Sequence, residues 1–209
     1  MARKFSLIAA ALVVSLGGGA QAATVLNGSF EMTPGFDNGR NWQVYQSVEG
    51  WTTSDGAGIE IQSNSTLGGI DAQDGNHYVE LDSHGSSSNS RMTQMVELTP
   101  GSYKLSFYYA PRTGRTDSNG ISFNVGDLVF GSVSGPSGTY ERLHWQKVTT
   151  QFEVKEGGLY DLSFAATGRE DTLGGLLDNV SLSAVPLPAS ALLLLGGIGA
   201  MGAMRRKRR

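Results

Sequence analysis

Residues 102–109 read SYKLSFYY, with apolar side chains at the odd positions and mostly polar ones between them. This period-two alternation is typical of a β-strand that buries one face and exposes the other. The same alternation recurs over residues 121–125 and 148–154, and again at Tyr160, Leu162 and Phe164 and at Val180 and Leu182. Residues 58–62, 77–82 and 91–98 are further strand candidates.

Turn-forming segments separate these runs. They read DGN at 74–76, TPG at 99–101, SNG at 118–120, GPSG at 135–138 and EGG at 156–158. Many short strands divided by such turns predict an all-β domain built as a β-sandwich. The sequence shows no internal repeat, so residues 23–184 are expected to form one domain.

The two ends of the chain differ from this middle part. Residues 1–22 combine a basic start at Arg3 and Lys4, an apolar run and a small-residue AQA end, which is the pattern of a secretory signal peptide. Residues 185–209 begin with a Pro-containing segment, continue with an uncharged stretch to Met204 and end in RRKRR. A stretch of about 20 apolar residues is long enough for one transmembrane helix, whose basic end stays in the cytoplasm.

This tail resembles the PEP-CTERM sorting signals in their VPLPA form. The resemblance rests on Val185, Pro186, Leu187, Pro188 and Ala189, on the following span and on the cluster that begins with Arg205 and Arg206. Leu187 stands where the common form has Glu. The resemblance implies cleavage by an exosortase-type enzyme in the envelope of an exopolysaccharide-producing cell. A similar tail is also described as an ice-binding protein C-terminal domain, and a permanent C-terminal membrane anchor is the alternative to cleavage.

Charge and cysteine content exclude several classes of function. All 19 acidic residues but only nine of the 16 Lys and Arg residues lie between residues 23 and 184, so this part carries a net charge of about −10. Nucleic acids and anionic lipids are poor partners for such a domain. The chain has 0 Cys, which excludes disulfides, thiol catalysis and thiolate metal sites.

An ordered set of short motifs spans the middle domain. They are LNGSFE (26–31), GW (50–51), GIEI (58–61), DGNHYVELD (74–82), PGSYKLSF (100–107), the strand at Trp145 and LDNVSL (177–182). In this order they resemble the DUF642 type of galactose-binding-like jelly roll. That resemblance implies a non-catalytic, surface-located domain associated with polysaccharide. DUF642 proteins often carry two tandem copies with disulfides, whereas this chain has one copy and no Cys.

Two carboxylates are candidate metal ligands. Jelly-roll carbohydrate modules often join the first and last strands of the domain around a structural Ca²⁺, and Glu31 and Asp178 occupy those two places in this chain. Carboxylate and carbonyl oxygens are the ligands that Ca²⁺ prefers. A hydrogen-bonded pair of chain ends without metal is the alternative.

Other residues are candidates for binding a sugar. Glu80 and Asp82 lie two apart on one predicted strand and therefore share a face, where they could bind hydroxyls, act as acid and base, or form a solvated face. Aromatic rings offer flat apolar surfaces for stacking, and Trp145 is predicted to point outward. Packing in the core is the alternative role, and it is the expected one for Trp51. The full set of ligand-binding candidates is Trp51, Glu60, Tyr78, Glu80, Asp82, Arg112 and Trp145.

The sequence thus predicts an exported, non-catalytic binding module that interacts with exopolysaccharide at the cell envelope, on the outer surface or in a secreted matrix. The C-terminal helix would hold it in the inner membrane until an exosortase acts. A small glycan-active hydrolase and a structural biofilm or adhesion protein, including an ice-binding one, are the alternatives.

Overall fold

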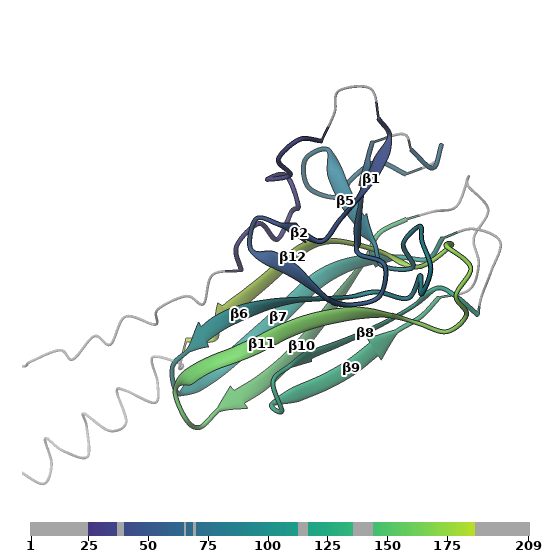
Figure 1. Ribbon diagram of the computed structural model, residues 1–209. Helices are drawn as coiled ribbons and strands as arrows, with labels where there is room; N and C mark the ends of the chain where they lie inside the picture. The colour runs from purple at the N-terminus through teal and green to yellow at the C-terminus, as the bar shows by residue number, and fades with distance from the viewer. Residues whose placement is uncertain are drawn as a thin grey trace, which may run out of the picture.

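The computed structural model describes residues 25–36, 40–64, 66–68, 70–112, 117–135 and 144–186. Two six-stranded antiparallel sheets make up this part of the chain (Figure 1). The first sheet has the order β1 (Trp42–Tyr45), β4 (Ile59–Ser63), β5 (His77–Glu80), β12 (Leu176–Ala184), β7 (Gly101–Ala110) and β10 (Gln146–Val154). The second has the order β2 (Ser47–Val48), β3 (Trp51–Asp55), β6 (Arg91–Leu98), β11 (Gly158–Thr167), β8 (Gly120–Val125) and β9 (Val129–Val133).

The predicted all-β sandwich is therefore confirmed. The whole of the predicted signal peptide lies outside the described residues. So does the sorting tail beyond Pro186. Across the described ranges, no helix has the length and apolar character needed to cross a membrane. The predictions for the two ends of the chain stay predictions.

The period-two pattern explains most of the strands. The predicted strand at residues 91–98 coincides with β6, and the one at 102–109 lies within β7. Four strands were not predicted, namely β1, β2, β3 and β9. Each is short, and β3 reads WTTSD, with one buried residue at its start, so an alternating pattern has no room to appear.

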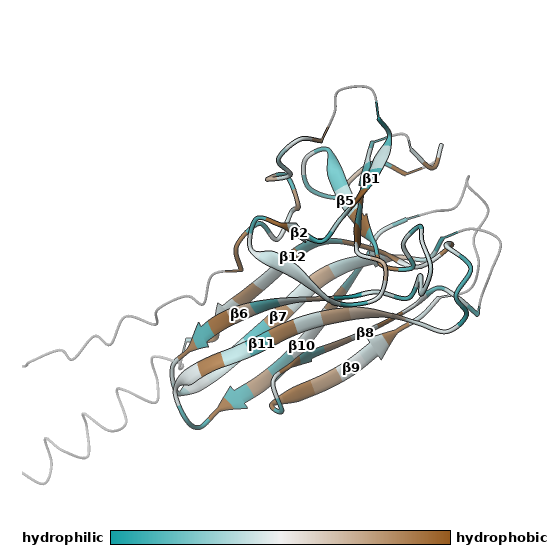
Figure 2. Ribbon diagram, in the orientation of Figure 1, coloured by the Kyte–Doolittle hydropathy of each residue, from teal (hydrophilic) through white to brown (hydrophobic). Residues whose placement is uncertain are grey.

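Apolar side chains of both sheets meet in one core. Phe107 of β7 packs its ring edge against Phe123 and Phe164 of the second sheet, with ring centroids 5.0 and 5.1 Å apart. Figure 2 shows hydrophobic and hydrophilic positions following one another along the strands. The apolar half of each strand therefore holds the two sheets together.

The outer face of the first sheet carries a second, smaller apolar cluster. Tyr78, Ala110 and Leu176 come from the strands, and Leu67 and Ile70 come from the segment that follows β4. Tyr78 has no exposed surface. This part of the sheet is consequently covered on both faces, and polar residues in the same rows are buried with it.

The start and the end of the domain lie together, as expected. The Val180 amide donates to the Gly28 carbonyl at 2.8 Å. A Cβ at position 28 would lie 2.0 Å from the Val180 carbonyl oxygen, so only glycine allows this approach. The adjoining Asn27 carbonyl accepts a hydrogen bond from Trp51 Nε1 at 3.2 Å. The N-terminal segment thus closes one part of the core.

The burial of Trp51 decides between its two expected roles, core packing and stacking on a sugar. Trp51 is 1% exposed and packs against Phe30 and Phe164. A ring that stacks on a sugar needs an open face, and Trp51 has none. Its role is to fill the core and to hold the N-terminal segment.

We expect Trp51→Ala to lower the free energy of unfolding by about 3–5 kcal/mol, because it removes a large buried ring and leaves a cavity. Urea denaturation followed by circular dichroism measures this loss. Phe130→Ala is the matched control, since Phe130 is 72% exposed and its loss should change stability by no more than about 0.5 kcal/mol. Equal effects of the two substitutions would contradict the placement of Trp51.

Candidate functional site

Two carboxylates lie side by side on the outer face of the first sheet. Glu60 of β4 and Glu80 of β5 are directly opposite each other in the antiparallel register. Their neighbours Ile61 and Val79 point into the core, so the glutamates must point to the other face. Both glutamates are 0% exposed. Two buried carboxylates in contact are costly unless other groups compensate them.

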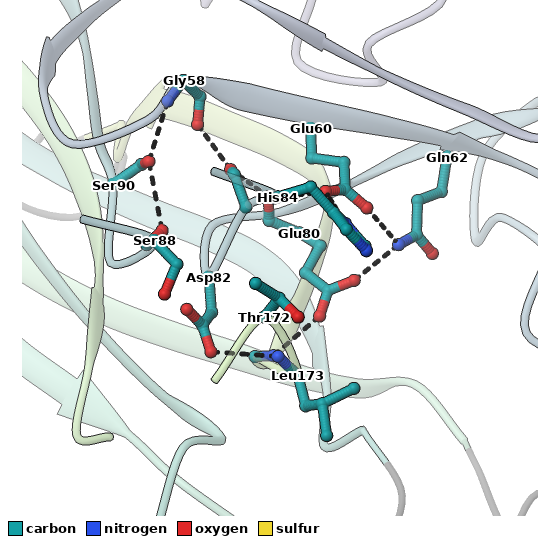
Figure 3. A network of polar contacts seen from close by, with 12 residues as sticks. Gly58, Glu60, Gln62, Glu80, Asp82, His84, Ser88, Ser90, Thr172 and Leu173 are labelled. Carbon is teal, nitrogen blue, oxygen red and sulfur yellow. Dashed lines mark hydrogen bonds and ion pairs between the residues drawn. The ribbon is translucent and has the colours of Figure 1, made fainter. Parts of the chain in front are cut away.

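Gln62 and Arg112 provide much of this compensation. The Gln62 side-chain amide donates to Glu60 Oε1 at 2.9 Å and to Glu80 Oε2 at 2.5 Å (Figure 3). Arg112 Nη1 donates to both oxygens of Glu80, at 2.6 Å to Oε2. The Gly174 amide donates to Glu80 Oε1 at 2.7 Å. Every interaction of this cluster fixes a side chain that would otherwise have several rotamers.

His84 connects the cluster to the surface. Its backbone amide and its Nδ1 lie 2.8 and 2.7 Å from Glu60 Oε2. Its ring stacks on Trp42 of β1, with centroids 4.2 Å apart and planes 18° from parallel. Trp42 is 41% exposed and the His84 side chain is 44% exposed. The buried Glu60 side chain therefore positions an exposed pair of flat rings.

A groove of about 820 Å³ runs along this part of the molecule. Trp42, Val44 and His84 provide apolar and aromatic surface, and Glu60, Gln62 and Arg112 provide polar groups. The remaining lining residues are Arg40, Asn41, Gln43, Thr66 and Leu67. The mixture of flat apolar surface and a few oriented polar groups is typical of sites for small polar ligands.

The segment between β11 and β12 forms hydrogen bonds with residues of the cluster and with Asp82. The Thr172 carbonyl accepts from Arg112 Nη1 at 2.9 Å, and the Leu173 amide donates to Asp82 Oδ2 at 3.0 Å. Thr172 has a φ of 62°, which is strained for a β-branched residue. Such strain persists only where surrounding contacts enforce it, and here these include the bonds to Arg112 and Asp82.

Burial raises the pKa of Glu80 to about 8, and the neighbouring Glu60 carboxylate acts in the same direction. Arg112 opposes this shift through its charge and its hydrogen bonds. A proton on Glu80 reduces the repulsion between the two glutamates. The cluster can therefore hold one proton within a hydrogen-bonded network.

The structure places the predicted ligand-binding residues in three different environments. Glu60 and Arg112 line the groove, and Glu80 lies directly behind them. Asp82 is 0% exposed, so the idea that Glu80 and Asp82 form a solvated face is wrong. The sheet face that carries them is covered by the segments around Leu67 and Leu173.

Tyr78 and Trp145 lie away from the groove. Tyr78 is fully buried in the second apolar cluster, so its prediction as a ligand contact is also wrong. Trp145 is half-buried, packs its edge on Tyr78 at 5.8 Å and donates from Nε1 to the Asp71 carbonyl at 2.8 Å. Trp145 lies on the outer face of the first sheet, the side that the sequence predicted, but there its ring covers the apolar cluster.

Sequence reasoning missed Trp42, Gln62 and His84 as site residues. Trp42 follows the turn-forming residues NGRN at 38–41, and that position could have suggested a strand start with an exposed ring. Gln62 lies two residues after Glu60 on the same strand and therefore on the same face. No local signal indicates that His84 returns to Glu60, because the turn that brings it there depends on tertiary contacts.

Glu31 and Asp178 both bind the segment before β5. Glu31 Oε1 accepts from the amides of Asn76 and His77 at 2.8 and 2.7 Å. Asp178 accepts from the amides of Gln73, Asp74 and Asn179 at 2.7, 3.0 and 2.6 Å. Oxygens that already accept backbone N–H groups fit poorly as ligands of a Ca²⁺ shared by the two carboxylates. Calcium binding at this pair stays a prediction.

No family model matches the chain. The multifunctional-autoprocessing repeats-in-toxin protein of Vibrio vulnificus is 29% identical over 164 residues, which are 77% of this chain and 3% of the toxin. The chain thus spans a very small part of that relative's length. The PEP-CTERM and DUF642 resemblances of the sequence stay predictions.

Several solved structures are similar in fold. The TmCBM61 module in complex with β-1,4-galactotriose is 20% identical, with coverage of 76% of this chain and 96% of that chain and a TM-score of 0.48. The module CBM6cm-2 from Cellvibrio mixtus lichenase 5A, in complex with cellotriose, is 15% identical, with coverage of 64% and 92% and a TM-score of 0.40. The K1 adhesin domain of Lys-gingipain from Porphyromonas gingivalis is 17% identical, with coverage of 69% and 98% and a TM-score of 0.47. These similarities concern the β-sandwich alone.

We expect Glu80→Gln to change the pH dependence of stability. The pKa of Glu80 is raised from 4.5 to about 8 in the folded state, so the folded protein binds a proton that the unfolded chain releases between these values. The stability of the wild type relative to the variant should therefore be greatest below pH 4.5 and decrease as the pH rises towards 8. Thermal melting of both proteins from pH 4 to 8.5 measures this. A relative stability that increases with pH would mean that Arg112 keeps Glu80 ionised.

Proposed function

We propose that this domain is a non-catalytic module that binds a glycan in the groove beside Trp42. The observation that carries the proposal is the exposed Trp42–His84 stack next to Glu60, Gln62 and Arg112. Sugars present an apolar face of C–H groups and a rim of hydroxyls. A flat ring beside oriented donors and acceptors matches both features.

The groove is organised before any ligand arrives. Gln62 is held by both glutamates, and Arg112 is held by Glu80 and the Thr172 carbonyl. Fixed side chains lose little conformational entropy on binding, which favours affinity at a small site. The buried carboxylates thus act mainly as supports for the residues that meet the ligand.

The same geometry argues against hydrolysis. A glycosidase needs two carboxyl groups that reach the scissile bond, and an acid must come within hydrogen-bond distance of its target. Glu60 lines the groove, but Glu80 is absent from the lining and is fully buried behind Gln62 and Arg112. Both glutamates are 0% exposed, so the pair is not placed to meet the scissile bond of a ligand as two catalytic carboxyl groups.

The charge of the domain indicates the class of glycan. Residues 23–184 carry a net charge of about −10, which repels polyanions at low ionic strength. The lining of the groove contains both signs of charge, with Glu60 beside Arg40 and Arg112. A neutral polysaccharide is the ligand class that fits both the domain and the groove.

We expect Trp42→Ala to abolish retention on neutral polysaccharide gels, because it removes the exposed ring of the groove. Affinity electrophoresis through gels with different embedded glycans measures retention and identifies the ligand. Phe130→Ala is the matched control, since it removes an exposed ring from β9 of the other sheet and should leave retention unchanged.

Two outcomes would contradict the proposal. Equal retention of the wild type and Trp42→Ala would place the binding surface elsewhere. Release of reducing sugar by the wild-type domain, lost in Glu60→Gln, would establish the hydrolase alternative. The melting temperature of each variant shows whether a loss of retention reflects unfolding.

We further propose that the protein is exported to the cell envelope and loses its C-terminal tail there. The support is the order of the Pro-containing segment at residues 185–189, the apolar stretch and the terminal RRKRR. Mass spectrometry of the native protein should find a chain that lacks about 20 residues at the C-terminus, since a transmembrane helix has this length. An intact C-terminus in the membrane fraction would instead establish a permanent anchor.

A further inference from the structure

Asp82 carries a buried oxygen that the protein leaves unsatisfied. Asp82 is 0% exposed. Its Oδ2 accepts from the amides of Asp171 and Leu173 at 3.2 and 3.0 Å, whereas its Oδ1 has no hydrogen-bond partner within the described part of the chain. Figure 3 shows one carboxylate oxygen bonded to Leu173 and the other pointing away from it. An unsatisfied buried carboxylate oxygen lowers the stability of the fold, so we expect a ligand to bind at this position.

Asn89 presents a second oxygen of the same kind at the same place. Asn89 Oδ1 is buried, and no described residue donates to it. Asp82 and Asn89 form an isolated antiparallel bridge. Directly opposite residues of an antiparallel pair point to the same side, with Cβ atoms about 5 Å apart. The two unsatisfied oxygens therefore belong to neighbouring side chains on one face.

The segment at residues 168–173 crosses this face. Asn89 Nδ2 donates to the Gly168 carbonyl at 2.9 Å, and the Asp171 amide donates to Asp82. The side chain of Asp171 is only 12% exposed. The backbone of Asp171 is thus bonded to Asp82, and a second acidic side chain starts from this largely buried position.

We propose that Asp82, Asn89 and Asp171 bind a Ca²⁺ ion. Ca²⁺ prefers carboxylate, amide and carbonyl oxygens and tolerates irregular geometry. Asp82 and Asp171 can offer carboxylate oxygens, and Asn89 can offer its amide oxygen. The described ranges contain no group of three or more His, Asp or Glu residues suited to a metal. Backbone carbonyls and water must therefore complete the coordination shell.

The site is distinct from the pair Glu31 and Asp178. Those carboxylates bind amides of residues 73–77 and 179, whereas Asp82 and Asp171 lie beside the segment between β11 and β12. Arg169 is one charged neighbour of Asp171, with Nε 3.9 Å from Asp171 Oδ2. Its side chain is 55% exposed, so solvent screens the pair and the guanidinium can turn away when a cation binds.

Binding at this site would stabilise the segment that supports the groove. Thr172 accepts from Arg112, and Gly174 donates to Glu80. Both residues lie within three positions of Asp171. A cation that fixes Asp171 would hold the backbone in the strained conformation at Thr172.

Titration of the full chain with CaCl₂ after removal of metal by EGTA tests the proposal. Isothermal calorimetry should detect one site with a Kd on the order of 10⁻⁴–10⁻³ M, the range of extracellular calcium modules. The melting temperature should rise with Ca²⁺ because the ion binds only the folded state. Asp82→Asn should abolish both effects, and Asp178→Asn should leave the calorimetric site in place.

Asn89→Asp provides a second test, in which the expected result is tighter binding and therefore cannot be caused by unfolding. A third carboxylate should lower the melting temperature in EGTA, through repulsion of Asp82, and should tighten Ca²⁺ binding at least about tenfold. An unchanged Ca²⁺ response in Asn89→Asp would overturn the proposal. So would the absence of any calorimetric signal in the wild type, which would leave a buried water molecule as the partner of Asp82 and Asn89. Neither readout uses a glycan, so they are independent of the proposed function.

Discussion

The antiparallel pairing of β4 with β5 sets the arrangement of the whole site. This register places Glu60 opposite Glu80 on a face that neighbouring segments bury. Two adjacent carboxylates in such a place are tolerated only with donors around them. Gln62, Arg112, the His84 amide and the Gly174 amide are those donors. These hydrogen bonds link the glutamate pair to residues of the groove and to the segment before β12.

Because of this constraint, the buried groups support the site and the exposed groups form its surface. The glutamates are too deep to serve as two catalytic carboxyls, but their hydrogen bonds orient Gln62, Arg112 and His84. His84 in turn stacks on Trp42 at the surface. Side chains held by several hydrogen bonds have little freedom to move, and rigidity suits a module that recognises a ligand and leaves it unchanged.

The strands on both sides of the core could be predicted in large part from the sequence. Residues 102–109 alternate in residue type and residues 91–98 alternate in burial, because one face of each strand packs against the opposite sheet. Glu60 and Arg112 were identified as candidates from residue type. Trp51, Tyr78 and Trp145 were candidates for the same reason, and two of them are buried. An aromatic residue suits both a core and a sugar platform, so residue type cannot distinguish these roles.

The sequence by itself determined the all-β class, most of the strands and the acidic charge of the domain, because alternation and composition are local properties. The tertiary structure alone decided that Glu80 and Asp82 are buried, that His84 returns to Glu60, and that Trp42 has an exposed ring at the groove. These outcomes depend on which segment covers the second face of the first sheet. The covering residues, such as Leu67 and Leu173, are separated by about a hundred positions in the chain, and no pattern within a single strand records that they meet there.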